Sequence, residues 1–240
     1  MKKTYYLIII IFLYSVFFFV LEMHNFPKIA AKVKAVVVPS ICVFYIIDLN
    51  NKLLFFKIFL ILFSITDLLI FTDAFIPINF KYYIGNTLYI VAYIILIYSV
   101  VRRVDLSKIL TEFKLTVGVL FLMNIYVLYA LLNVDLVLES SPLISSMSSV
   151  ILELIYNAVT FILFTVSFLN YLYKNNKESL YLFIGTLCVV FSEVIQFVTT
   201  YPSNQKLLNT ACYVLLVLGF SFFYLFASLK AVGEQEIASL

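Results

Sequence analysis

The amino-acid sequence predicts an all-α, polytopic integral membrane protein, and three observations support this class. Hydrophobic residues make up 64% of the 240 residues and charged residues only 12%, whereas soluble domains have about 45–50% apolar and about 25% charged residues. The mean hydropathy of the chain is +1.10. The hydrophobic residues gather in long runs, and a run of about 20 such residues crosses a bilayer as a helix. The excess of hydrophobic side chains must therefore face lipid.

Eight hydrophobic runs follow one another along the chain, separated by charged residues or by proline and asparagine. The strands of a membrane barrel alternate polar and apolar residues, and runs such as residues 7–12 do not. Helices are therefore the expected spanning elements. The predicted spans are residues 5–21, 33–49, 53–71, 83–101, 115–132, 150–169, 180–200 and 207–229.

The second run is the least regular of the eight. It is short and contains Pro39, and Lys32 and Lys34 stand at its start. The aliphatic stems of these lysines can extend so that their charged groups reach the membrane surface. A re-entrant segment is the alternative to a full helix at this place.

The distribution of basic residues predicts the orientation of the spans. With eight spans, 11 of the 16 lysines and arginines fall on the side of the two termini and 5 on the opposite side. Cytoplasmic loops carry the excess of basic residues, so we expect both termini in the cytoplasm. The expected location is a bacterial cytoplasmic (inner) membrane, which the chain crosses several times.

No linker divides the chain, so we expect one transmembrane domain over residues 1–240. The third and seventh runs share a short pattern, Asp67-Leu-Leu-Ile-Phe71 and Glu193-Val-Ile-Gln-Phe197, each after a Phe-Ser pair. Such a repeat suggests a weak duplication of residues 1–114 and 115–240. A chance match in so biased a sequence is the alternative.

Several function classes are disfavoured by the sequence. The net charge of +3 is spread along the chain, which gives no basic patch for nucleic acid. The chain has one histidine, and Cys42, Cys188 and Cys212 lie far apart in apolar runs. We therefore expect small buried cysteines, no metal site and no cofactor.

Three acidic residues interrupt the hydrophobic runs: Asp67, Glu153 and Glu193. An acid at the centre of a membrane helix costs about 2.5–3.5 kcal/mol on insertion scales, so each needs a partner or a polar cavity. With the predicted orientation, all three fall in the outer half of the bilayer. Each also has a structural alternative: an ion pair of Asp67 with Lys34, a hydrated Glu153, and a hydrogen-bonded pair of Glu193 with Gln196.

Other polar residues fall in the same half of the bilayer. Glu153 and Asn157 are four residues apart, and Glu193 and Gln196 are three apart, so each pair shares a helix face. We expect a polar chamber that opens on the outer side, with Lys34 available to pair with a carboxylate. Its remaining polar residues are Asn86, Asn209 and Tyr213.

The segments around these acids resemble the YhhN family of eight-span membrane proteins, which includes the lysoplasmalogenases. The similar segments are Lys34-Ala-Val-Val-Val-Pro39, Phe59-Leu-Ile-Leu-Phe-Ser-Ile-Thr-Asp67, Gly185-Thr-Leu-Cys-Val-Val-Phe-Ser-Glu193, and Gly219 near the end of the last run. The chain departs from the family pattern where it has Thr66 for glycine, Glu193 for aspartate, Tyr93 for histidine and Tyr213 for glutamine.

The resemblance implies hydrolysis of the vinyl-ether bond of a lysophospholipid, with a membrane lipid as the partner. For this chemistry we assign, as a hypothesis, Glu193 as general acid and Asp67 as the stabilising carboxylate or base; the reverse assignment of the two acids is the alternative. The substrate-binding residues expected around them are Lys34, Asn86, Tyr93, Glu153, Asn157 and Tyr213. Two alternatives remain: a non-catalytic protein of the same fold that binds a lipid or another partner, which the missing histidine favours, and a small-solute or proton-coupled transporter.

Overall fold

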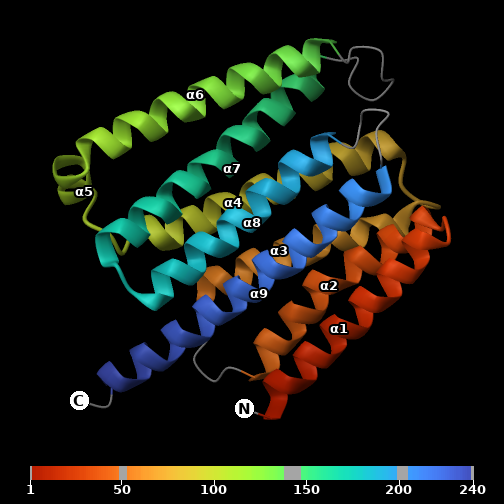
Figure 1. The fold of residues 1–240 in the computed structure, drawn as a ribbon, viewed down its shortest axis with the longest axis horizontal. Helices are drawn as coiled ribbons and strands as arrows, with labels where there is room; N and C mark the ends of the chain where they lie inside the picture. The colour runs from red at the N-terminus through yellow and green to blue at the C-terminus, as the bar shows by residue number, and fades with distance from the viewer. Residues whose placement is uncertain (1, 49–52, 138–146, 199–204, 239–240) are drawn as a thin grey trace.

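The computed structural model describes residues 2–48, 53–137, 147–198 and 205–238, and within these residues it has helices and no strands (Figure 1). The predicted span ends at residues 49 and 200 lie outside the described residues. The helices are α1 (Lys2–Met23), α2 (Pro27–Asp48), α3 (Leu54–Leu68), the 3-10 helix η1 (Leu69–Thr72), α4 (Ile78–Val101), α5 (Leu106–Glu112), α6 (Lys114–Val137), α7 (Met147–Lys174), α8 (Lys177–Val198) and α9 (Gln205–Ala238).

Eight helices in the described ranges are long and apolar enough to cross a membrane. The prediction of an all-helical chain with eight potential spans is therefore confirmed for this part of the chain. The second span is a full helix: α2 runs for 22 residues with Pro39 inside it, so the re-entrant alternative is wrong. Neighbouring helices can satisfy the backbone group that an internal proline leaves free.

Two short elements were not predicted. The helix α5 follows α4, and its N-cap Asp105 accepts a hydrogen bond from the backbone N–H of Lys108, which is the usual role of aspartate at this position. Nearby, the Arg102 guanidinium lies 4.8 Å from the ring centre of Phe55. The other element is η1, which begins directly after the last residue of α3. The α-helix therefore changes into the narrower 3-10 helix shortly after Asp67.

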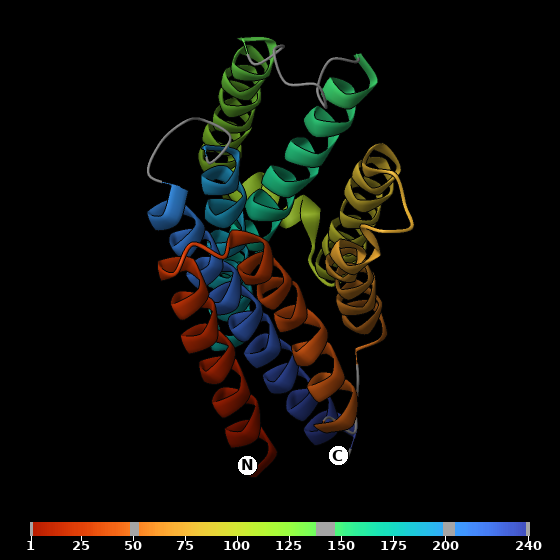
Figure 2. The ribbon, with the colours of Figure 1, turned by 90° about the vertical axis from the view of Figure 1, so that its right-hand side faces the viewer.

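Most helices that follow one another in the sequence pack side by side, but α4 packs on α7 rather than on α5 or α6, and α2 and α1 also contact α9. The bundle therefore joins its first and last helices. The helix α6 lies at the edge and contacts only α5 and α7 closely among the described elements (Figure 1). The start of α1 and the end of α9 lie at the same end of the bundle (Figure 2).

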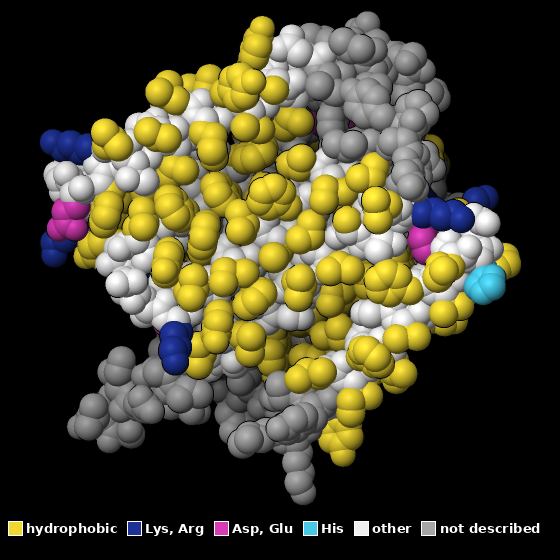
Figure 3. All heavy atoms as spheres, viewed as in Figure 1, with side chains coloured by type: hydrophobic (Ala, Val, Ile, Leu, Met, Phe, Trp, Pro, Cys, Tyr) yellow, Lys and Arg dark blue, Asp and Glu magenta, His cyan; other side chains and the backbone are white. Residues whose placement is uncertain are grey.

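The surface of the bundle is apolar along most of its length. On the face shown in Figure 3, hydrophobic side chains cover the middle, and the charged side chains gather at the two ends. The helix α6 is the extreme case, since Leu115 is 82% and Tyr126 70% exposed. This distribution is the one expected when lipid surrounds the helices.

The centre of the bundle is a cluster of aromatic rings between α3 and α9. Phe59 and Phe220 are fully buried and stack with their ring centres 6.0 Å apart, and Phe63 packs on Phe220 at 4.6 Å. Between helices in lipid, close packing rather than the exclusion of water stabilises the contact. The cluster holds α3 against α9 directly below the polar residues of both helices.

The closest helix contact is between α8 and α9, at Gly185 and Gly219. A Cβ atom added to either glycine would lie 3.0 Å from the carbonyl oxygen of the other. Small residues that let two backbones approach are the usual device for packing membrane helices. This crossing fixes α8 relative to α9 and so sets where Ser192, next to Glu193 in the sequence, donates a hydrogen bond of 3.0 Å to the carbonyl oxygen of Cys212, two turns farther along.

Candidate functional site

A cavity of about 620 Å³ lies at one end of the bundle, where α1, α3 and α8 finish and α2, α4, α7 and α9 begin. This end is opposite to the one that holds the start of α1 and the end of α9 (Figure 2). Its volume is within the range of about 300–1,000 Å³ that is common for small-molecule sites. Seven helices and η1 contribute to its wall.

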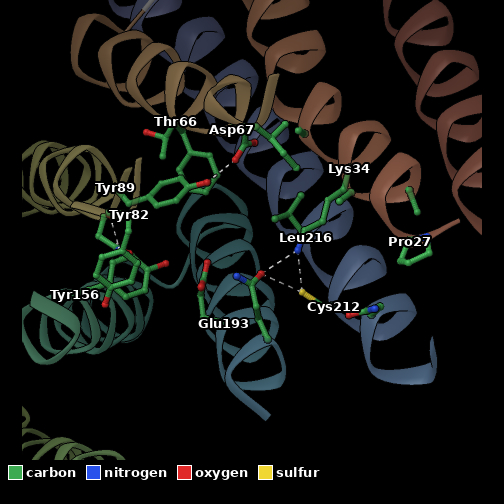
Figure 4. A pocket seen from close by; sticks show the side chains of 18 of the residues that line it. Pro27, Lys34, Thr66, Asp67, Tyr82, Tyr89, Tyr156, Glu193, Cys212 and Leu216 are labelled. Carbon is green, nitrogen blue, oxygen red and sulfur yellow. Dashed lines mark hydrogen bonds between the residues drawn. The ribbon is translucent and has the colours of Figure 1, made fainter. Parts of the chain in front are cut away.

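The cavity brings together most of the polar residues that the sequence singled out. The prediction of one chamber that contains both Asp67 and Glu193 is confirmed (Figure 4), whereas the role of each residue stays a prediction. The other expected residues that line the cavity are Lys34, Asn86, Glu153, Asn157, Gln196 and Asn209.

Asp67 lies at the end of α3 and is held by a tyrosine from the next helix. The hydroxyl of Tyr89 donates a hydrogen bond of 2.5 Å to Asp67 Oδ1. The ring of Tyr89 is itself fixed by Phe63, whose ring centre is 4.5 Å away. Asp67 is close enough to Lys34 and Glu193 to interact with both electrostatically. Its position is therefore set by a rigid aromatic wall, and its surroundings contain charges of both signs.

Glu193 enters the cavity from α8, where tyrosines of two other helices surround its carboxyl group. The carboxyl group lies beside the hydroxyls of Tyr156 on α7 and Tyr93 on α4. Figure 4 shows Tyr156 and Glu193 on the same wall, with Asp67 on a neighbouring one. The two acids thus come from helices far apart in the sequence, and each has a tyrosine hydroxyl next to it.

Lys34 corrects one expectation. Its ammonium group donates to Gln196 Oε1 at 3.0 Å and to Cys212 Sγ at 3.2 Å, and it forms no ion pair within 4.0 Å with any described carboxylate. The expected direct pairing of Lys34 with an acid is therefore wrong, because α8 and α9 present nearer acceptors. Cys212 is buried, as expected, but it is a hydrogen-bond partner and not only a small hydrophobe.

Tyr93 and Tyr213 correct a second expectation, since neither is among the residues that line the cavity. Tyr213 is fully buried and stacks on Phe18, with ring centres 4.0 Å apart. Its hydroxyl shares a hydrogen bond of 3.2 Å with Ser15. Tyr213 thus joins α9 to α1 below the cavity and does not face a ligand there, and Tyr93 lies behind the wall that Tyr156 and Glu193 form.

The sequence reasoning missed several residues of the cavity wall, and those with the most notable polar groups are Glu22, Tyr82, Tyr89 and Tyr156. Glu22 is only 6% exposed and accepts a hydrogen bond of 3.1 Å from Asn209 Nδ2. It stands at the end of the first hydrophobic run and not within it, so it was not among the acids that interrupt the runs.

The tyrosines of α4 carried a signal that the reasoning left unused. Tyr82, Asn86 and Tyr89 follow one another at spacings of four and three, which places them on one helix face. Because Asn86 was expected in the chamber, this spacing could have added both tyrosines. Tyr82 donates a hydrogen bond of 2.6 Å to Glu153 Oε1.

The charges of the cavity are unbalanced. The carboxyl groups of Glu22, Asp67, Glu153 and Glu193 line it, and Lys34 is the one cationic residue among the described residues of its wall. No three His, Cys, Asp or Glu side chains of the described ranges are grouped as metal ligands. The described wall of the cavity therefore combines several carboxyl groups with a single cationic group.

The loop between η1 and α4 adds a charged contact outside the membrane-spanning segments. Asp73 contacts the ammonium group of Lys81. The hydrogen bond from Lys81, together with the charges of Lys32 and Lys28, holds the pKa of Asp73 below its ordinary value. These lysines make the end of the bundle at the cavity positive, whereas the cavity itself is rich in acids.

Comparisons of the chain with protein-family models, curated proteins and solved structures find no match. The resemblance to the YhhN family is therefore a prediction from the quoted segments alone. The cavity in which Asp67 and Glu193 meet is thus the main indication of function.

Proposed function

We propose that this protein is a membrane hydrolase that cleaves the vinyl-ether bond of a lysophospholipid by carboxyl acid/base catalysis, as lysoplasmalogenases do. The observation that carries the proposal is the meeting of Asp67 and Glu193, from α3 and α8, in one cavity with Lys34. Acid/base catalysis of this kind needs one carboxyl group that donates a proton and one that accepts a proton. Two acids in different surroundings meet this need.

The reaction consumes one water and needs no oxidant or reductant. The acid protonates the vinyl carbon that does not bear oxygen, and the double-bond electrons form the new C–H bond. The resulting oxocarbenium ion is stabilised by the nearby carboxylate. Water then adds to the cationic carbon and gives its proton to that carboxylate. The hemiacetal collapses to a fatty aldehyde and the free hydroxyl of the glycerophospholipid part.

The shape of the cavity supports an amphiphilic substrate. Its deeper wall is apolar, with Phe18, Phe63 and Leu216, whereas Glu22 and Asn209 lie near the helix ends. A ligand with one hydrocarbon chain and a polar head matches this division. Lys34 provides a positive charge for the phosphate of such a lipid or orients the neighbouring acids.

The orientation is part of the proposal. The excess of lysine and arginine, 11 against 5, supports both termini in the cytoplasm of a bacterium and the cavity opening on the outer face of its inner membrane. The substrate would then enter from the outer leaflet.

Labelling of a cysteine introduced into the cavity wall tests this orientation without any enzymatic assay. Ala31 lines the cavity and is partly exposed, and membrane-impermeant methanethiosulfonate reagents added to spheroplasts are expected to modify the Ala31→Cys variant. The acid-rich cavity should make a cationic reagent react about tenfold faster than an anionic one. The wild-type protein is the control for the three native cysteines. Modification only in inside-out vesicles would contradict the proposed orientation.

An aldehyde assay tests the proposed function itself. The purified protein, incubated in detergent micelles with a lysophospholipid that bears a vinyl ether, should release fatty aldehyde. The matched control is the lipid with a saturated ether, which has no double bond to protonate and should be stable. Aldehyde at the background level would discard the hydrolase. Thermal stabilisation by both lipids without turnover would identify a lipid-binding protein.

A further inference from the structure

One buried hydroxyl next to Glu193 has no hydrogen-bond partner among the described residues. It belongs to Tyr93 of α4, which is 0% exposed. The ring packs against Phe59, Phe63 and Tyr156, with ring centres 5.9 to 6.4 Å away. This packing from α3 and α7 fixes the ring, so the hydroxyl cannot turn toward another part of the protein.

A polar group in this position is unfavourable unless it has a partner. Burying a hydroxyl away from water without a hydrogen bond costs free energy, and the lipid around the bundle supplies none. Phenylalanine would fill the same space without this cost. The hydroxyl of Tyr93 lies beside Glu193 and Tyr156 but forms no well-directed hydrogen bond with either of them, so a further polar partner would complete its hydrogen bonding.

The surroundings of the hydroxyl indicate what this partner is. The hydroxyl faces the carboxyl group of Glu193 and the hydroxyl of Tyr156, and both of these residues line the cavity. Buried waters occupy places where two to four polar groups converge. We propose that a water molecule binds between Tyr93 and Glu193, and that this water is the one consumed in the hydrolysis of the vinyl ether.

Only the second half of the proposal rests on the proposed function. In the bound arrangement, the Tyr93 hydroxyl donates to the water oxygen and the water donates to a Glu193 oxygen. When the oxocarbenium ion forms, the water oxygen supplies the electron pair of the new C–O bond. Its O–H bond breaks and the proton passes to Glu193. Glu193 is then the general base of the reaction.

This assignment exchanges the roles that the sequence suggested for the two acids. Asp67 becomes the general acid. The hydrogen bond from Tyr89 occupies Asp67 Oδ1, which leaves Oδ2 to carry the proton that passes to the vinyl carbon. Tyr93, which stands where the family pattern has histidine, binds the water and is not a proton donor to the lipid.

The stability of Tyr93→Phe tests the water site without any activity. If the water is bound, the variant loses a hydrogen bond and its Tm falls by several degrees. If the hydroxyl has no partner, its removal leaves the Tm unchanged or raises it, which would overturn the site. Tyr126→Phe, on the exposed face of α6, should not change the Tm. Tyr45→Phe, which loses the hydrogen bond of 2.9 Å from the Leu53 N–H, calibrates the effect.

Kinetics test the role of the water in the reaction. Tyr93→Phe should lower kcat about tenfold and leave KM unchanged, because the hydroxyl binds the water and not the lipid. A lowered Tm with unchanged kcat would keep the water site and overturn its catalytic role. If wild-type protein releases no aldehyde, the proposed function and that role both fail. The Tm comparison then decides whether the Tyr93 hydroxyl has a hydrogen-bond partner, and an experimental map decides whether that partner is a water. An experimental map that resolves ordered waters must show one beside Tyr93 Oη.

Discussion

Asp67→Asn and Glu193→Gln should each reduce aldehyde release by about 10²- to 10⁴-fold, the usual contribution of a general acid or base. A carboxamide has nearly the same shape as a carboxyl group, but it neither delivers nor accepts a proton at neutral pH. The measurement is kcat with the vinyl-ether lysophospholipid in micelles. Because the two acids act on one reaction, the double variant should lose little more than either single variant.

Two other acids of the same cavity provide matched controls. Glu22→Gln and Glu153→Gln remove the same charge from the same cavity, but their carboxyl groups are bound to Asn209 and Tyr82 and have no role in the proposed reaction. Their loss of activity should stay below about tenfold. Equal losses in all four variants would show that the charge of the cavity matters and would contradict a specific acid/base pair.

The carboxamide variants are also expected to fold, which makes the activity result interpretable. Replacing an ionisable group by a neutral polar one lowers the cost of placing it in the membrane. In Asp67→Asn, the Tyr89 hydroxyl can still donate to the carboxamide oxygen, as it donates to Asp67 Oδ1 in the wild type. A Tm close to that of the wild type checks this point. A large fall in Tm would mean that the lost activity reports on unfolding.

The spans could be predicted because lipid imposes a simple rule on the sequence. Every backbone group of a spanning segment must be paired within the segment, so a hydrophobic run of sufficient length becomes a helix. The same rule identified the acids: Asp67 and Glu193 stand out because an ionisable residue in such a run needs a polar environment. Both acids do lie in one cavity.

The partners of these acids could not be predicted in the same way. The rotation of each helix about its axis depends on packing against its neighbours, and the hydrophobic residues cover all faces of most runs, so the pattern does not show which face is buried. Lys34 was therefore paired with an acid in the prediction, whereas it contacts Gln196 and Cys212. Tyr89 and Tyr156 resembled the many other tyrosines of the helices, although their hydroxyls lie at Asp67 and Glu193.

The short helix α5 was missed for a different reason. Its seven residues are too few to form a hydrophobic run, and its start is set by a local hydrogen bond from the Lys108 N–H to Asp105. Such capping patterns are common in loops. They become informative only when the surrounding helices hold the ends of the segment in place.

Gly219→Ala should produce the largest loss of stability of any small substitution in α9. The added methyl group would lie 2.9 Å from Val189 Cγ2 and 3.0 Å from the carbonyl oxygen of Gly185, and the backbone atom cannot move without separating α8 from α9. Overpacking of this kind costs about 1–3 kcal/mol. Gly185→Ala should cost at least as much, because its added methyl group would lie 2.6 Å from a ring atom of the fully buried Phe223 and 3.0 Å from the carbonyl oxygen of Gly219.

Gly118→Ala is the matched control, since a Cβ atom at this position of α6 has nothing within 4 Å. In a helix, alanine is more favourable than glycine by about 0.5–1 kcal/mol, so this variant should be as stable as the wild type or more so. The thermal midpoints of the three variants in the same detergent give the comparison. Because the crossing also sets the position of α8, which carries Glu193, Gly219→Ala should lower the activity of the fraction that remains folded. Equal midpoints for Gly219→Ala and Gly118→Ala would show that α8 and α9 are not in close contact at these glycines.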